Sequence, residues 1–73
     1  GEGTLDRALR VLACFGEDEP ELGATRLGEL TGLSPSTLHR LLARMVDLGL
    51  LARVPGRRYV VGQRLFELGE LSP

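Results

Sequence analysis

The sequence contains no tryptophan and no lysine, and it has one cysteine and one histidine among 73 residues. Cys14 therefore has no partner for an internal disulfide, and the chain lacks the cysteines and histidines of a structural zinc site. We expect Cys14 to be a core or interface residue, and we expect neither a metal nor a cofactor. No apolar run approaches the roughly 20 residues that cross a bilayer, and the first residues do not resemble a signal peptide. The predicted location is the cytoplasm, with no membrane contact.

The composition, with 42% apolar and 26% charged residues, is typical of a soluble globular domain. A chain of this length buries only about 60% of the surface that it exposes when unfolded, so its core must be compact. We predict one domain over residues 1–73.

Charge is unevenly distributed along the chain, although the net charge is only −1. Residues 1–33 carry three arginines and seven acidic residues, whereas residues 34–64 carry six arginines and one acidic residue, Asp47. A basic stretch of this kind indicates a surface that attracts anions, nucleic acid among them. A binding face is therefore expected in the second half.

Two helices are predicted before residue 33. The first covers 4–15, and its apolar residues recur at three- and four-residue steps, which predicts one buried stripe of Leu5, Ala8, Leu9, Leu12 and Phe15. An acidic loop over 16–23 follows, with a very short strand near Leu22. The second helix has Thr25 as its expected N-cap, turns Leu27 and Leu30 inward and ends at Gly32.

A third helix begins within about three residues of the second. Ser34 is its expected N-cap, Pro35 suits the first helical position and Gly49 ends the helix. Its apolar positions fall on one side, which predicts a core stripe of Leu38, Leu41, Leu42, Met45 and Leu48. Two β-prone runs, 50–54 and 59–61, flank a Pro-Gly turn and predict a small hairpin. A helical pattern closes the chain over 63–71.

The predicted fold class is mainly α with a small β-hairpin: a winged helix-turn-helix with a three-helix core, a two-stranded wing and the start of a linker helix. The helix-turn-helix spans about residues 25–44, the wing about 50–61, and the linker helix begins at about 63. This motif presents its second helix to the major groove, which is about 12 Å wide and accepts a helix.

The side chains expected to contact DNA lie opposite the leucine stripe of the third helix and in the wing. They are Thr25, Arg26, Ser34, Ser36, Thr37, His39, Arg40, Arg44, Arg57 and Arg58. Arg40 is the predicted base-contacting residue, because arginine binds guanine O6 and N7 bidentately. Arginines opposite a leucine stripe can equally be a solvated helix face, His39 can simply cover Leu42, and Thr25 with Arg26 can serve only as a helix cap.

Several segments together resemble the IclR family of bacterial regulators. They are Ala8–Leu12, Leu27–Leu42, Leu48–Leu51, Arg58–Gly62 and Arg64–Gly69, which cover nearly the whole chain. Gly28 stands where the family usually has alanine, and the acidic loop over 17–21 is longer than in some members. Neither departure touches the expected DNA-binding surface.

The resemblance implies a DNA-binding domain that dimerises on a partly palindromic operator. It also implies a C-terminal effector-binding domain, absent from these residues, through which a small-molecule effector would act. By position, the family's recognition helix falls on Ser36, Thr37, His39 and Arg40, and its wing on 56–59. The expected partners are double-stranded DNA and a second copy of the chain.

Three other functions are alternatives to DNA binding. A winged helix can dock proteins, but protein interfaces favour aromatic anchors, and the three aromatic residues here are scattered. An enzyme is not expected, because the sequence has no acid and base pair, no Ser/His/Asp set and no phosphate-binding glycine motif. Binding of unpaired RNA would require exposed aromatic residues for stacking. A protein-docking module remains the main alternative.

Overall fold

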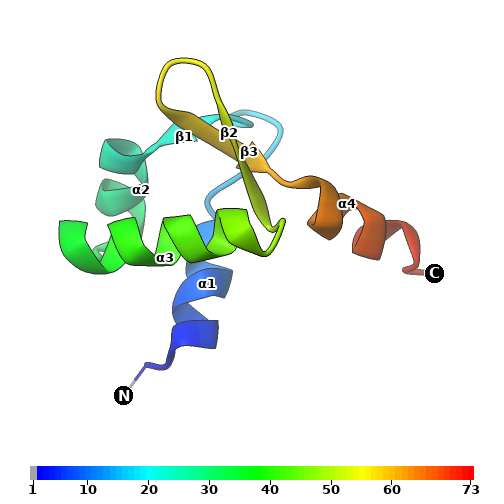
Figure 1. Cartoon of the computed structure of the whole chain (residues 1–73), viewed down its shortest axis with the longest axis horizontal. Coiled ribbons are helices and arrows are strands. Elements are labelled where there is room, and N and C mark those ends of the chain that lie inside the picture. The colour runs from blue at the N-terminus through cyan, green and yellow to red at the C-terminus, as the bar shows by residue number, and fades with distance from the viewer. Residues whose placement is uncertain (1) are drawn as a thin grey trace.

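Four helices and three short strands follow one another along residues 2–73, which a computed structural model describes (Figure 1). The elements are α1 (Thr4–Leu12), β1 (Leu22–Gly23), α2 (Ala24–Thr31), α3 (Pro35–Asp47), β2 (Leu51–Val54), β3 (Arg58–Val61) and α4 (Gln63–Glu70). The predicted order of three helices, a hairpin and a last helix is confirmed, and so is the very short strand at Leu22.

The strands form one antiparallel sheet in the order β1-β3-β2. In the hairpin, Leu51 pairs with Val61 and Val54 with Arg58, while Leu22 of β1 pairs with Tyr59 on the other edge of β3. The wing was predicted with two strands, and the structure adds β1 as a third. In Figure 1 the sheet lies above α3 and α1 descends below it, and the core lies between the sheet and the helices α1, α2 and α3.

The core draws one or more side chains from α1, β1, α2, α3 and β2. Its buried members are Val11, Leu22, Leu27, Leu38, Leu41, Leu42, Met45 and Leu51. Half of them belong to α3. Burying a side chain of this size contributes roughly 1.5–3 kcal/mol, so the inner face of α3 is the main support of the fold.

The prediction for the first helix was partly wrong. Leu5 is 77% and Leu9 60% exposed, whereas Val11, which was not in the predicted stripe, is completely buried. The helix ends at Leu12, with Ala13 as its C-cap, so Phe15 lies beyond it. α1 is apolar over so wide an arc that its spacing alone did not determine which edge faces the core.

Three further details differ from the predictions. α2 begins at Ala24 with Gly23 as its N-cap, and not after Thr25, because Gly23 already has the extended backbone of the strand that it ends. Leu30 is 43% exposed instead of buried. Leu48 is 49% exposed, because it is the C-cap of α3 and lies past the last full turn.

Glycine is required at two points that set the arrangement of elements. Gly32 ends α2 in the left-handed region, with a φ of 73°, as predicted. Gly62 leaves no space for a β-carbon, because one would overlap the backbone of Gly49. Hydrogen bonds from Gly62 N–H to the Leu50 carbonyl (2.9 Å) and from Arg64 N–H to the Gly49 carbonyl (3.1 Å) then fix the start of α4, which leads away from the core (Figure 1).

Candidate nucleic-acid interface

The outer face of α3 is polar because its inner face is occupied by the core. Ser34 caps the helix by accepting a hydrogen bond from Thr37 N–H at 3.4 Å, and Pro35 is the first helical residue, both as predicted. Ser36, His39, Arg40 and Arg44 are exposed on the opposite side, and Thr37 is half-buried at its edge. Within residues 2–73, neither arginine of α3 forms an ion pair.

The turn between α2 and α3 is held by Thr31, the one polar side chain that is buried among the described residues. Its hydroxyl donates to the Leu27 carbonyl at 2.7 Å and accepts from Leu33 N–H at 3.3 Å. The guanidinium of Arg10 donates to the Thr31 carbonyl and also pairs with Glu2. α1 therefore holds the turn that orients α3, and Arg10 is occupied by this contact.

A groove separates α3 from the wing, and most of its polar side chains are basic. It is lined by Ala24, His39, Arg53, Val54, Arg57, Arg58 and Tyr59. The guanidinium carbon of Arg53 lies 6.0 Å from the centroid of the Tyr59 ring, at the outer limit of a cation–π contact. No carboxylate lines this groove, so it attracts anions.

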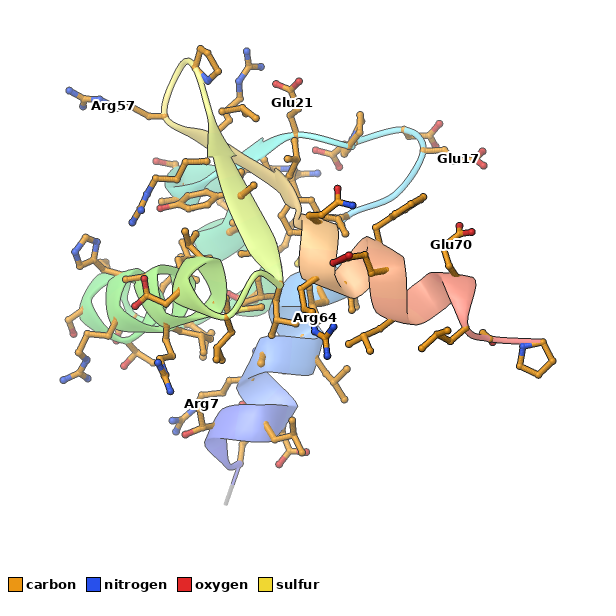
Figure 2. The ribbon with its side chains drawn as sticks, turned by 45° about the vertical axis from the view of Figure 1, so that its right-hand side comes forward. Arg7, Glu17, Glu21, Arg57, Arg64 and Glu70 are labelled. Carbon is orange, nitrogen blue, oxygen red and sulfur yellow. The ribbon has the colours of Figure 1, made fainter. Side chains whose placement is uncertain are left out.

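The two wing arginines differ in their surroundings. Arg57 sits in the hairpin turn with a φ of 59°, and Figure 2 shows its side chain pointing away from the tip. It forms no ion pair with another residue of 2–73, whereas Arg58 lies 3.5 Å from a carboxylate oxygen of Glu21. Arg57 therefore has its full charge available to a ligand, and that of Arg58 is partly neutralised.

Thr25 and Arg26, neighbours in α2, lie on different sides of it. Thr25 lines a second, largely apolar groove together with His39 and Tyr59, next to the wing groove. Arg26 instead binds both carboxylate oxygens of Glu19 at 3.0 and 3.1 Å and lies 3.6 Å from Glu29. The hydrogen bonds from Arg26 lower the pKa of Glu19 below its ordinary value. Arg26 is thus not brought together with the other predicted residues.

Sequence reasoning missed three residues at this surface. Arg53 and Tyr59 line the wing groove beside His39. Arg7 of α1 lines a hollow with Thr37, Arg40 and Arg44, on the side of α3 away from the wing. The sequence signal for Arg7 is its position one turn before Val11, on the buried side of α1. The predicted apolar stripe of this helix omitted Val11, so Arg7 was not expected beside α3.

Cys14 is half-buried against the core, and its thiol donates to the Arg10 carbonyl at 3.2 Å. Burial raises the pKa of this thiol above its ordinary value. Among residues 2–73 no three potential metal-ligating side chains gather at one point. Over the same residues, no helix has the length and apolar character that crossing a membrane requires.

An exposed helix that follows a glycine turn and lies beside a basic hairpin defines a winged helix-turn-helix domain, a fold that presents this helix to the DNA major groove. The predicted fold class is confirmed. The family model of the IclR helix-turn-helix domain matches residues 4–55. The chain therefore belongs to the IclR family, as its sequence resemblance indicated.

Two relatives of known name are similar over most of this chain. The HTH-type transcriptional regulator TsaQ1/TsaQ2 of Comamonas testosteroni is 42% identical over 67 residues, which are 90% of this chain and 24% of that protein. The HTH-type transcriptional regulator XynR of Escherichia coli (strain K12) is 39% identical over 67 residues, 90% of this chain and 27% of that protein. This chain thus spans about a quarter of their length. Both relatives are named as regulators and neither as an enzyme.

Solved structures of IclR proteins have the same fold. An IclR homolog from Microbacterium hydrocarbonoxydans, complexed with 4-hydroxybenzoate, has a TM-score of 0.86 and 36% identity over 90% of this chain and 28% of its own. An IclR family transcriptional regulator from Brucella abortus has a TM-score of 0.85 and 33% identity over 94% of this chain and 26% of its own. Family and relatives support DNA binding in transcription regulation, and neither favours protein docking.

Proposed function

We propose that this chain binds double-stranded DNA with α3 in the major groove and the wing on the phosphate backbone. The observation that carries this proposal is the outer face of α3, where Arg40 and Arg44 are exposed and have no ion pair within residues 2–73. Unpaired arginines on a rigid helix are suited to base edges and phosphates.

The roles of individual residues follow from their positions along α3. Arg40 lies at the middle of the outer face and is the proposed guanine-contacting residue, with Ser36 one turn before it. His39 lies on the wing side, and Thr37 with Arg44 on the opposite side. These positions allow base contacts at the middle of the face and phosphate contacts at its edges.

Phosphate contacts are proposed for the residues around α3. Arg57 and Arg58 would contact the backbone from the wing, and Thr25 and Ser34 from the N-terminal ends of α2 and α3, where peptide N–H groups favour anions. The contact predicted for Arg26 is the least supported of the set, because its guanidinium already binds Glu19 and Glu29.

A homodimer is proposed from the apolar side chains that the domain leaves exposed. Leu5 and Leu9 of α1 and Phe66 of α4 are each at least 60% exposed. Large apolar side chains that stay exposed on adjacent turns of one helix, as Leu5 and Leu9 do, are typical of association surfaces. A second copy covering them would place two α3 helices on a partly palindromic operator, one in each half-site. Sedimentation of the chain as a monomer at high concentration would contradict this proposal for the isolated domain.

The longer relatives provide the remaining proposals. The chain spans about a quarter of their length, and one solved IclR homolog is complexed with 4-hydroxybenzoate. We therefore propose a cytoplasmic regulator in which a segment outside this sequence binds a small-molecule effector.

Selection from a library of randomised DNA duplexes tests the proposed function. The chain is bound to the library, and retained duplexes are amplified and sequenced over several rounds. A recurring half-site, bound at least about 10³-fold more tightly than mixed-sequence DNA, is the expected result. Retention without any enriched sequence would contradict sequence-specific binding, and no retention would favour the protein-docking alternative.

A further inference from the structure

A hollow between α1 and α3 brings Arg7 of α1 together with Arg40 and Arg44 of α3, which are distant from it in sequence. It is lined by Thr4, Arg7, Thr37, Arg40, Leu41 and Arg44. In Figure 2, Arg7 projects from α1 on the side of α3 opposite the wing, and Arg57 marks the wing tip on the other side. Basic side chains therefore flank α3 on both sides.

The charges in this hollow are not compensated within the domain. No carboxylate lines the hollow, and Arg7, Arg40 and Arg44 form no ion pair among residues 2–73. The carboxylate nearest in sequence, that of Asp6, accepts the N–H of Gly3 at 3.1 Å. Three like charges that line one hollow repel each other, and an anion bound between them offsets this repulsion. The hollow thus has the composition of an anion site.

We propose that Arg7 and Arg44, beside the base-contacting Arg40, form a phosphate-binding subsite for the DNA strand opposite to the one that the wing contacts. This inference rests on the proposed function. The two backbones bordering the major groove are about 12 Å apart across the groove. A helix lying in that groove has one backbone on each side, so basic groups on both flanks of α3 meet different strands. Arg7 is then a DNA-contacting residue outside both the helix-turn-helix and the wing.

The planar guanidinium groups favour a phosphodiester as the ligand, because each can donate two parallel hydrogen bonds to phosphate oxygens. The hydroxyl groups of Thr4 and Thr37 line the same hollow and supply further donors. Arg7 is half-buried, so fewer solvent-exposed conformations compete with the bound one. A subsite on α1 would also connect DNA binding to the helix that holds the turn through Arg10.

Salt dependence of binding is the first test. Affinity of the chain for a mixed-sequence duplex is measured by fluorescence anisotropy between about 50 and 200 mM salt, where each phosphate contact contributes a slope of about −0.9. Arg7→Gln should flatten the slope by about 0.9 and so reduce the affinity change over this range by about three- to fourfold. Arg7→Lys keeps the charge and should retain the slope.

The matched control is Arg64→Gln, which removes from α4 one arginine charge that forms no ion pair within residues 2–73 and does not line the hollow. We expect this control to leave the slope unchanged, and all variants to keep the wild-type thermal unfolding midpoint by circular dichroism. If Arg64→Gln and Arg7→Gln flattened the salt slope equally, the change would follow from the net charge of the chain alone, and the proposed subsite would be overturned.

Strand assignment is the second test. On the selected operator, phosphate ethylation interferes with wild-type binding wherever the protein contacts the backbone. Arg7→Gln should remove interference on one strand beside each half-site, and Arg57→Gln on the opposite strand. Loss on the same strand in both variants, or no loss in Arg7→Gln, would overturn the proposal. These results leave the proposed function standing, whereas a wild-type chain that binds no DNA would overturn both.

Discussion

The two helices of the helix-turn-helix are alike on the inside and different on the outside. Leu27 of α2 and Leu42 of α3 are both almost completely buried in the same core. On the outer side, Arg26 of α2 is bound to Glu19 and Glu29, whereas Arg40 and Arg44 of α3 have no ion pair within residues 2–73.

This difference shows why the overall charge of −1 misleads. The acidic residues around the loop over 17–21 neutralise arginines close to them, namely Arg26 and, through Glu21, Arg58. They leave the outer face of α3 basic. A nearly neutral domain can thus keep one surface that attracts phosphate while the rest of its surface does not.

The largest expected effects come from the shared core. Leu27→Ala and Leu42→Ala should each lower the free energy of unfolding by about 2–5 kcal/mol, because each leaves a cavity among buried side chains. Urea unfolding followed by circular dichroism measures this loss, with the exposed Ser36→Ala expected to stay within about 0.5 kcal/mol of wild type. If only one of the two leucine variants lost much of its free energy of unfolding, the inner faces of α2 and α3 would not contribute equally to the core.

The outer faces should differ in DNA binding. Arg40→Ala should cost roughly 1–3 kcal/mol on the selected operator and weaken discrimination against changed bases, because a bidentate guanine contact is lost. Arg26→Ala should leave affinity and discrimination nearly unchanged. Anisotropy titrations against the operator and single-base variants measure both. If Arg40→Ala weakened all sequences equally, Arg40 would be a phosphate contact and not the base-contacting residue.

The two wing arginines allow the same comparison between an arginine with no ion pair among residues 2–73 and a paired one, with smaller expected effects. Arg57→Ala should weaken binding to all sequences alike and flatten the salt slope by about 0.9. Arg58→Ala should flatten it less, because Glu21 already neutralises part of its charge. Glu21→Gln removes that neutralisation and should steepen the slope. Equal slopes for wild type and Glu21→Gln would show that the ion pair does not limit Arg58.

The smallest expected effect concerns the pair of Arg26 with Glu19. The pKa of Glu19 is lowered in the folded state by its hydrogen bonds to Arg26. A carboxylate with a lowered folded pKa stabilises the fold above its unfolded pKa, near 4.3, and this contribution disappears as the pH falls through the folded value. Thermal unfolding midpoints measured as the pH falls below about 4.3 should therefore drop slightly more for wild type than for Glu19→Gln. If the midpoints of wild type and Glu19→Gln fell in parallel with pH, the ion pair of Arg26 with Glu19 would not contribute to stability.

Much of the fold was predictable because local signals agreed with one another. Ser34, Pro35 and Gly32 mark helix ends by their own chemistry, so the positions of α3 and of the turn were predicted correctly. The leucines of α3 lie on a narrow stripe, so the residues on its outer face could be predicted from their positions opposite that stripe. Pairing of β1 with β3 was not predicted, because it joins Leu22 to Tyr59 across a long stretch of sequence and has no local signal.

The site was less predictable than the fold. Whether an arginine has an acidic partner depends on contacts between elements, so the sequence could not distinguish Arg26 from Arg40 or Arg58 from Arg57. The sequence also did not predict that α1 contributes Arg7 to this surface, because this too depends on contacts between elements. The apolar arc of α1 is too wide to orient the helix, and only the fold reveals that Arg7 lies beside α3.

The most direct test of the central claim is the salt dependence of wild-type binding to mixed-sequence duplex DNA, measured by fluorescence anisotropy at about 50 and 200 mM salt. If arginines on both sides of α3 replace counterions on DNA, several contacts should combine, and affinity should fall by orders of magnitude between the two conditions. Binding that changes little with salt, or no binding at either concentration, would contradict an arginine surface built for the DNA backbone.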